Sequence, residues 1–239
     1  MVLGAVGADV ARRAFAESGR HRTASEPAVE TAAVLGGRSA AVPDTAVNAA
    51  ARRDRTRERL REENERTYLA ESLTDTDSML RRWPDARITR PLRIAIVRQN
   101  VDGFREDFVG NVNWAISRWN GVVPVQLETG ADSATADIVV TWTVRMDSNR
   151  TGRTDLTWDR RGNIRQALIV LATHTPEGQL LDTRRMAALA LHEVGHAMGL
   201  GHSPVKQDAL YPVTLAQELS DRDIRTARLL YDLPAGSVR

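Results

Sequence analysis

Three histidines and a glutamate lie close together in the C-terminal part of the chain. His192, Glu193 and His196 form an HExxH pattern, and Gly199 and His202 each follow after a further three residues. On a helix, side chains four positions apart lie about 40° from each other around the axis. His192 and His196 can therefore present two imidazoles to one Zn²⁺ ion, which prefers a tetrahedral shell of nitrogen, sulfur or oxygen ligands.

The third histidine can join this site only if the helix ends before it. Gly199 can adopt a left-handed backbone conformation, end the helix and turn the chain back toward the first two histidines. His202 then completes a set of three protein ligands, and water takes the fourth position, as in catalytic zinc sites. We predict one catalytic zinc ion, held by His192, His196 and His202.

Glu193 is in a position to act as a base beside this ion. It lies about 100° around the helix from His192, so its carboxylate is beside the metal rather than in line with the ligands. Zinc lowers the pKa of a bound water to about 7. Glu193 can take the proton as that water attacks a carbonyl and then pass it to a leaving amine. We predict hydrolysis of peptide bonds in a protein or peptide substrate, with Glu193 as the general base.

A simpler interpretation is a buried helix that carries histidines on its apolar flank. A chance match to all five fixed positions of the pattern is on the order of one in a hundred thousand, which favours the metal site. The simpler interpretation also leaves three imidazoles that each need a separate partner.

The segments that must position this site alternate between strand and helix patterns. Gly121 ends the first helix, and Asp182 and Ser220 are predicted N-caps of the last two helices. The predicted elements are strands at Leu92–Val97, Val123–Leu127 and Asp137–Val144, a hairpin of Arg153–Trp158 with Ile164–Ala172, and helices at Phe108–Trp119, Thr183–Met198 and Ser220–Tyr231.

The N-terminal part of the chain has a different composition. Residues 1–45 are rich in small residues and arginine without a regular period, and we predict a disordered tail or a degenerate signal region. Residues 46–86 are predicted to be a charged helical extension, because oppositely charged residues such as Arg59 and Glu63 stand four apart. We expect this helix mostly to face water, with a regulatory pro-segment or a partner-binding helix as the alternatives. We also expect the extension to add few apolar residues to the core of a domain at residues 87–239, although its far end could dock through Leu69, Leu73, Met79, Leu80 and Trp83.

Composition excludes several classes of function. The 239 residues are 42% hydrophobic and 27% charged, which is typical of a globular protein, and they include no cysteine, so thiolate nucleophiles and cysteine-ligated metals are excluded. A net charge of +2 gives little support to a nucleic-acid partner, and we predict none. No apolar run reaches the roughly 18 residues of a membrane helix, so a membrane partner is not supported. We expect a monomer.

The segment HEVGHAMGLGH resembles the extended zinc signature of the metzincin metalloproteases. Ser203, directly after the third histidine, is similar to the matrixin branch of that family. The closing segment around Leu219–Ile224 and Leu230–Tyr231, the triplet at Ala136–Ile138, and the pair Ala115 and Trp119 also resemble matrixins, of a bacterial type. The resemblance covers about Leu92 to Tyr231.

This resemblance implies an α+β, zincin-like fold with a mixed, mostly parallel five-stranded sheet and an active-site helix. It implies that the edge strand at about Arg153–Trp158 holds substrate by backbone pairing. It places Tyr211 and Pro212 at the specificity pocket, although they could equally be packing residues of a turn. It also implies an extracytoplasmic or secreted protein, although the targeting signal in this sequence is doubtful.

The chain departs from the family pattern in three respects. Leu210 occupies the place of the methionine that forms a tight turn below the zinc, unless that turn is absent and Leu210 is an exposed loop residue. Too few histidines remain for a second, structural zinc, so we expect none. A propeptide cysteine that confers latency is excluded, because the chain has no cysteine.

The predicted function is therefore that of a zinc-dependent endopeptidase. The alternative is a non-proteolytic binding protein that keeps the zinc fold and recruits an acidic partner through its Arg-rich segment. The intact Glu193 argues against this alternative, because a protein that only binds has no need of a base beside the zinc.

Overall fold

The computed structural model describes residues 44–147 and 149–239. The predicted tail therefore lies almost entirely outside the described residues. Within the described part of the chain, no helix combines the length and the apolar character needed to cross a membrane.

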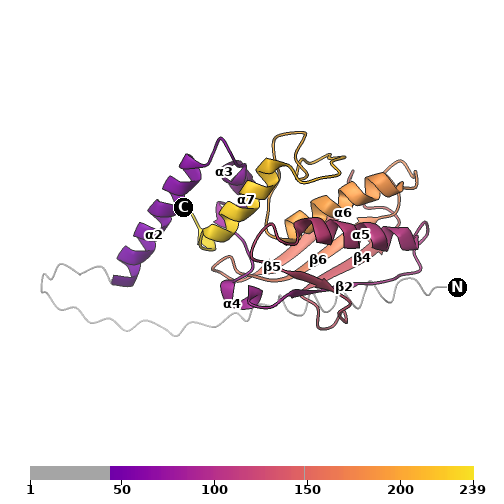
Figure 1. The fold of residues 1–239 in the computed structure, drawn as a ribbon, viewed down its shortest axis with the longest axis horizontal. Coiled ribbons are helices and arrows are strands. Elements are labelled where there is room, and N and C mark those ends of the chain that lie inside the picture. Colours follow the sequence, from indigo (N-terminus) through magenta and orange to yellow (C-terminus); the bar gives the residue numbers. More distant parts are fainter. Residues whose placement is uncertain (1–43, 148) are drawn as a thin grey trace, which may run out of the picture.

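A five-stranded sheet forms the centre of the domain (Figure 1). The order of strands is β3-β2-β4-β6-β5, with parallel pairing throughout except for β5, which runs antiparallel to β6 at the edge. The fold is thus α+β with a mixed, mostly parallel sheet, as predicted. The strands are β2 (Leu92–Ile96), β3 (Leu127–Thr129), β4 (Ile138–Thr143), β5 (Gly152–Trp158) and β6 (Ile164–Ala172).

Two amphipathic helices, α5 (Glu106–Trp119) and α6 (Thr183–Ala197), lie side by side over one face of the sheet (Figure 1). The predicted N-cap of α6 is confirmed, since the Asp182 side chain accepts a hydrogen bond from the backbone N–H of Arg185. The main core lies between these helices and the sheet. A smaller apolar cluster, which includes Val139 and Leu168, covers part of the other face.

The last long helix, α7 (Asp221–Asp232), begins with a capping box. The Ser220 hydroxyl accepts from the backbone N–H of Asp223, and the Asp223 carboxylate accepts from the backbone N–H of Ser220. In Figure 1, α7 lies beside the short helix α3 (Leu69–Ser72), from the opposite end of the chain.

One strand differs from the prediction. The segment Val123–Leu127 was expected to be a strand, but β3 starts only at Leu127. Pro124 has no backbone N–H and cannot take part fully in a ladder. The Asn120 side chain bonds both the N–H and the carbonyl of Leu127, which positions the chain where pairing with β2 begins.

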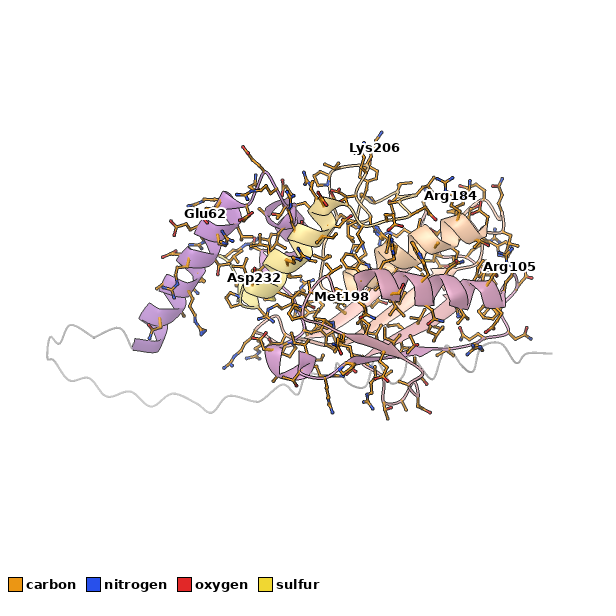
Figure 2. The ribbon with its side chains drawn as sticks, in the orientation of Figure 1. Glu62, Arg105, Arg184, Met198, Lys206 and Asp232 are labelled. Atoms are coloured by element: carbon orange, nitrogen blue, oxygen red, sulfur yellow. The ribbon has the colours of Figure 1, made fainter. Side chains whose placement is uncertain are left out.

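The charged extension is not one helix but a series of elements. α2 (Asp44–Glu62) is followed by α3, a 3-10 turn (Leu73–Thr76), β1 (Met79–Leu80) and α4 (Asp85–Ile88). β1 pairs with the C-terminal strand β7 (Gly236–Ser237). The predicted pair of Arg59 and Glu63 is present at 3.1 Å. Side chains project from α2 on both sides (Figure 2), and most of those described are exposed.

The expectation that the extension adds few apolar residues to the core is wrong for its second half. Tyr68 and Trp83 have no exposed surface, and Leu69 and Leu80 are 2% exposed. These residues show no helical period, because they lie on several short elements that pack against α7 and the end of α6. Only the tertiary contacts, which the local pattern does not contain, bury them.

Candidate metal centre

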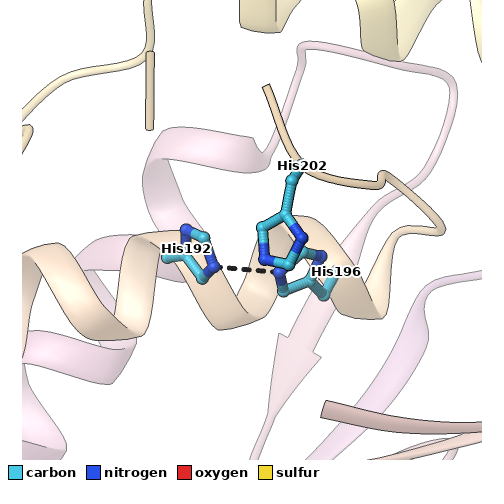
Figure 3. A group of neighbouring side chains, drawn as sticks. All are labelled: His192, His196 and His202. Atoms are coloured by element: carbon cyan, nitrogen blue, oxygen red, sulfur yellow. Dashed lines mark hydrogen bonds between the residues drawn. The ribbon is translucent and has the colours of Figure 1, made fainter. Parts of the chain in front are cut away.

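The three predicted histidines converge at the end of α6 (Figure 3). His192 and His196 project from adjacent turns of the helix, and His202 reaches them from the loop that follows. Each offers one ring nitrogen, and these three nitrogens all lie within 4.8 Å of one another. Among the described residues this is the group of side chains that could hold a metal ion.

The partners of the rings determine which nitrogen can bind metal. Nδ1 of His192 lies 2.8 Å from the Ala209 carbonyl, and Nδ1 of His196 lies 2.8 Å from the Leu200 carbonyl. A carbonyl only accepts, so both Nδ1 atoms donate and the Nε2 atoms keep their lone pairs. The two Nε2 atoms face each other at 2.9 Å. Two lone pairs this close favour a shared cation, so the donor set fits zinc.

Burial keeps these imidazoles in the neutral form, which is the form that can bind metal. It lowers the pKa of His192 to about 4, while the hydrogen bond to Ala209 opposes the change. Burial also lowers the pKa of His196 well below its usual value, with further contributions from the neighbouring histidines. Both imidazoles are therefore neutral at pH 7, as zinc ligands must be.

Gly199 makes the predicted turn after the helix. Its φ of +98° lies in the left-handed region. A Cβ at this position would also overlap the carbonyl oxygen of Arg81, so the backbone of the extension passes directly against it. Gly201 is similarly close to Ser72, since a Cβ added to this glycine would lie 2.7 Å from the Ser72 Cβ. The extension thus supports the loop that carries His202.

Three aromatic side chains fix the metal-binding helix by donating to its backbone carbonyls. Trp119 comes from α5, Trp83 from the extension and Tyr231 from α7. The bonds run from Trp119 Nε1 to Leu191 at 2.9 Å, from Trp83 Nε1 to Ala197 at 2.9 Å, and from the Tyr231 hydroxyl to Met198 at 3.0 Å. Met198 itself is buried where α6 ends, in the interior of the domain (Figure 2).

Glu193 follows His192 on α6 and lies against the edge strand β5. It is 3% exposed, and one of its carboxylate oxygens accepts a 2.6 Å hydrogen bond from the Thr154 hydroxyl of β5. Burial raises the pKa of Glu193 to about 7, against the lowering effects of the Thr154 bond and of Arg150. A carboxyl with this pKa can both take up and release a proton near neutral pH.

Leu210 lies directly beneath the metal-binding helix. It has no exposed surface, and a Cβ added to Gly195 would come within 2.9 Å of its side chain and 2.8 Å of Trp119. The alternative that Leu210 is an exposed loop residue is therefore wrong. Tyr211 is half-buried and Pro212 is exposed. Their place in a specificity pocket stays a prediction.

Two buried carboxylates, Asp208 and Asp223, support the segment around Ala209 and Leu210 that packs against α6. Their role was not predicted from the sequence. Asp223 has no exposed surface and accepts from the backbone N–H of Ala209 at 2.8 Å and from the Tyr68 hydroxyl at 2.8 Å. Ala209 is the residue whose carbonyl orients His192. Asp208 accepts from the hydroxyls of Ser203 and Ser220. The capping-box spacing before α7 was the one local signal for Asp223.

His174, the remaining histidine of the domain, is not part of this centre. It is half-buried, and a Cβ at Gly103 would lie 2.5 Å from its ring. Its Nδ1 lies 2.9 Å from the Thr173 hydroxyl.

An α+β domain in which one helix and the following loop bring three histidines together, with a buried glutamate beside them, defines the class of zinc metallopeptidases. The matrixin family model matches residues 82–232, which is more than half of the chain. The chain therefore belongs to the matrixin family and is a zinc metalloendopeptidase. Matrixins use a catalytic zinc ion and are typically secreted or extracellular. A search of curated proteins finds no match.

The buried position of Leu210 predicts different costs for two substitutions. Leu210→Ala should lower the free energy of unfolding by about 2–5 kcal/mol, because it leaves a cavity beneath the helix. Leu210→Met, which nearly conserves volume, should cost less than about 1.5 kcal/mol. Chemical denaturation measures the free energy of unfolding of both variants, and zinc titration measures their affinity for the metal. An alanine variant as stable as the parent would refute the packing role of Leu210.

The low histidine pKa values predict acid sensitivity of the metal-free protein. Between pH 6.5 and about 4 the unfolded chain binds protons at His192 that the folded chain does not, so stability should fall as the pH falls through this window. The change of the His192 pKa from 6.5 to about 4 corresponds to about 3 kcal/mol for this residue alone. His196 acts in the same direction.

Glu193 opposes this trend, because its raised pKa makes the folded chain bind more protons between pH 4.5 and about 7. The measurement is therefore made on metal-free Glu193→Gln by denaturation at several pH values. This variant should lose more stability on acidification than the metal-free parent chain. If the free energy of unfolding depends on pH in the same way in both proteins, Glu193 does not have a raised pKa in the folded chain.

Proposed function

We propose that the protein hydrolyses internal peptide bonds of protein or peptide substrates, with His192, His196 and His202 as ligands of one zinc ion and Glu193 as the general base. The observation that carries the proposal is the buried carboxylate of Glu193 on the same helix as the paired Nε2 atoms. When bound at these histidines, zinc supplies Lewis acidity that polarises the scissile carbonyl and activates water.

Glu193 performs the proton transfers in this proposal. It takes a proton from the attacking water at a carboxylate oxygen and delivers it to the amine that leaves. In the metal-free chain, burial raises the pKa of Glu193 to about 7, and this favours proton uptake by the carboxylate. His192 and His196 are held in one tautomer by the carbonyls of Ala209 and Leu200, so they keep their orientation through the reaction.

The substrate is proposed to lie along β5. This strand is at the edge of the sheet, so in the described part of the chain no further strand pairs with its outer side, and an extended peptide could pair there. Its residues Gly152 and Thr154 lie directly against Glu193. A peptide paired with β5 would therefore pass over the base and the metal ligands. We further propose that the protein acts outside the cytoplasm as a monomer, without a nucleic-acid or membrane partner.

The non-proteolytic alternative is not favoured by the extension. Residues 46–86 contain nine arginines and nine acidic residues, and some of these pair: Arg57 with Asp54 at 3.1 Å, and Arg59 with Glu62 at 3.2 Å. Such a surface has little excess positive charge with which to recruit an acidic partner.

The test is cleavage of casein by the purified full-length chain. New termini mapped by mass spectrometry should lie within the substrate, and 1,10-phenanthroline should stop cleavage while its non-chelating 1,7 isomer should not. Zinc added after removal of the chelator should restore activity. Stoichiometric zinc binding without cleavage of casein, gelatin or a diverse peptide library would favour the alternative.

A further inference from the structure

A general base must be held in place to be effective, and a glutamate side chain has several rotatable bonds. In a catalytic site, a misplacement of about 1 Å can lower the rate about 10²-fold. Glu193 lies on α6, and the strand that packs against it is β5. Two residues on one face of β5, Gly152 and Thr154, define the positions of its two carboxylate oxygens.

Thr154 contacts one of these oxygens. Its hydroxyl lies 2.6 Å from Glu193 Oε2 and 3.0 Å from the backbone carbonyl of Glu193. The shorter distance is typical of a hydroxyl that donates to a carboxylate. Thr154 is itself rigidly placed, because it is β-branched and its backbone pairs in register with Ile169 of β6.

Gly152 lies against the other oxygen. A Cβ at this position would overlap Glu193 Oε1 and would lie 2.6 Å from the Leu189 side chain. A residue without a side chain is therefore needed where β5 passes the carboxylate. The residues between and after them, Arg153 and Asp155, form an ion pair at 2.9 Å on the opposite face of the strand.

We propose that Thr154 is a positioning residue for the general base: its hydroxyl holds Glu193 Oε2, so that Oε1 is the oxygen that takes the proton. This inference rests on the proposed function, since it concerns the same base. It adds that the proposed substrate strand β5 also places the carboxylate, so the strand along which the peptide lies sets the geometry of proton transfer.

The test is Thr154→Val, which keeps the shape of the side chain and removes the hydroxyl. We expect kcat to fall about 10- to 100-fold, the size expected for loss of a hydrogen bond to a charged group. KM should stay within about twofold, and zinc content, measured by elemental analysis, should remain that of the parent. Thr154→Ser, which restores the hydroxyl, should recover most of kcat.

Thr141→Val is the matched control, because Thr141 lies on the inner strand β4, outside the proposed substrate strand, and its hydroxyl also donates a 2.6 Å hydrogen bond, to Gln99 Oε1. It should keep the parent kcat. A second variant, Gly152→Ala, places a methyl group where Glu193 Oε1 lies and should lower kcat with zinc retained. If Thr154→Val fails to fold, the kcat of Gly152→Ala tests whether β5 places the Glu193 carboxylate.

The outcomes separate this inference from the proposed function. Full activity of Glu193→Gln would overturn the proposed function itself. If Glu193→Gln is inactive but a folded Thr154→Val keeps the parent kcat, only the positioning role is overturned. If the valine variant does not fold, a parent kcat in Gly152→Ala has the same meaning. Loss of kcat in Thr154→Ser equal to that in Thr154→Val would also overturn it, because the hydroxyl would then not be the cause.

Discussion

Glu193→Gln should leave about one zinc ion per chain and lower kcat about 10²–10⁴-fold, the usual contribution of a general base. Glutamine has nearly the same shape, so it can fill the buried space beside Thr154, but its amide cannot accept a proton from water. The three histidines are untouched, and His192 and His196 keep their carbonyl partners. Casein cleavage rates give kcat, and elemental analysis of the same preparation gives the zinc content per chain.

His196→Ala is the matched comparison for this variant. It removes one of the two facing Nε2 atoms, so it should lose zinc as well as activity. The two variants thus separate the proposed base from the proposed ligand. Zinc retained without His196 and absent from Glu193→Gln would reverse the two assignments.

A chain that starts at Arg87 should fail to fold stably or to hold zinc. It lacks Tyr68, Leu69, Leu80 and Trp83, which are all buried in the core. Burial of a large apolar side chain contributes about 1.5–3 kcal/mol, so four such residues contribute roughly 6–12 kcal/mol. That is comparable to the entire stability of a typical domain, about 5–15 kcal/mol.

The same truncation removes direct support for the metal centre. It takes away the Trp83 hydrogen bond to the end of α6 and the backbone of Arg81 that packs against Gly199. It also removes the Tyr68 hydroxyl from Asp223. We therefore propose that the compact domain begins near Thr67 rather than at residue 87.

A chain that starts at Asn64 is the control for this experiment. It lacks α2, with the buried residues Thr56 and Leu60, but keeps every buried residue from Thr67 onward, so it should fold and bind about one zinc ion. Thermal unfolding and zinc content of the two shortened chains decide the question. A stable, zinc-binding chain from Arg87 would restore the boundary expected from the sequence.

The grouping of the three histidines was predictable from local spacing. Histidines four residues apart on a helix must share a face, and a glycine three residues later allows the helix to end. These relations depend only on helix geometry and on backbone sterics, so they predicted the convergence of His192, His196 and His202. The same is true of the caps at Asp182 and Ser220 and of the β5–β6 hairpin, since each depends on neighbouring residues.

The contacts that hold the metal centre in place join distant parts of the chain, and the sequence did not predict them. Tyr68 and Asp223 are far apart in sequence, and nothing in either segment indicates that a tyrosine hydroxyl will bond a carboxylate beneath the metal centre. The hydroxyl of Thr154 likewise meets Glu193 only because β5 packs over α6. A short polar or aromatic side chain has no periodic signature, so its partner is decided by packing.

The contribution of the extension to the core was underestimated for the same reason. Hydrophobic periodicity identifies a buried segment when one regular element is long enough to show a repeat, as in α5. Leu69 and Leu80 lie on separate short elements, and Trp83 lies between two of them. The charged sequence before these residues has the composition of an exposed helix. Their burial follows from the free energy gained when they cover α7 and the end of α6, and only the folded chain brings those surfaces together.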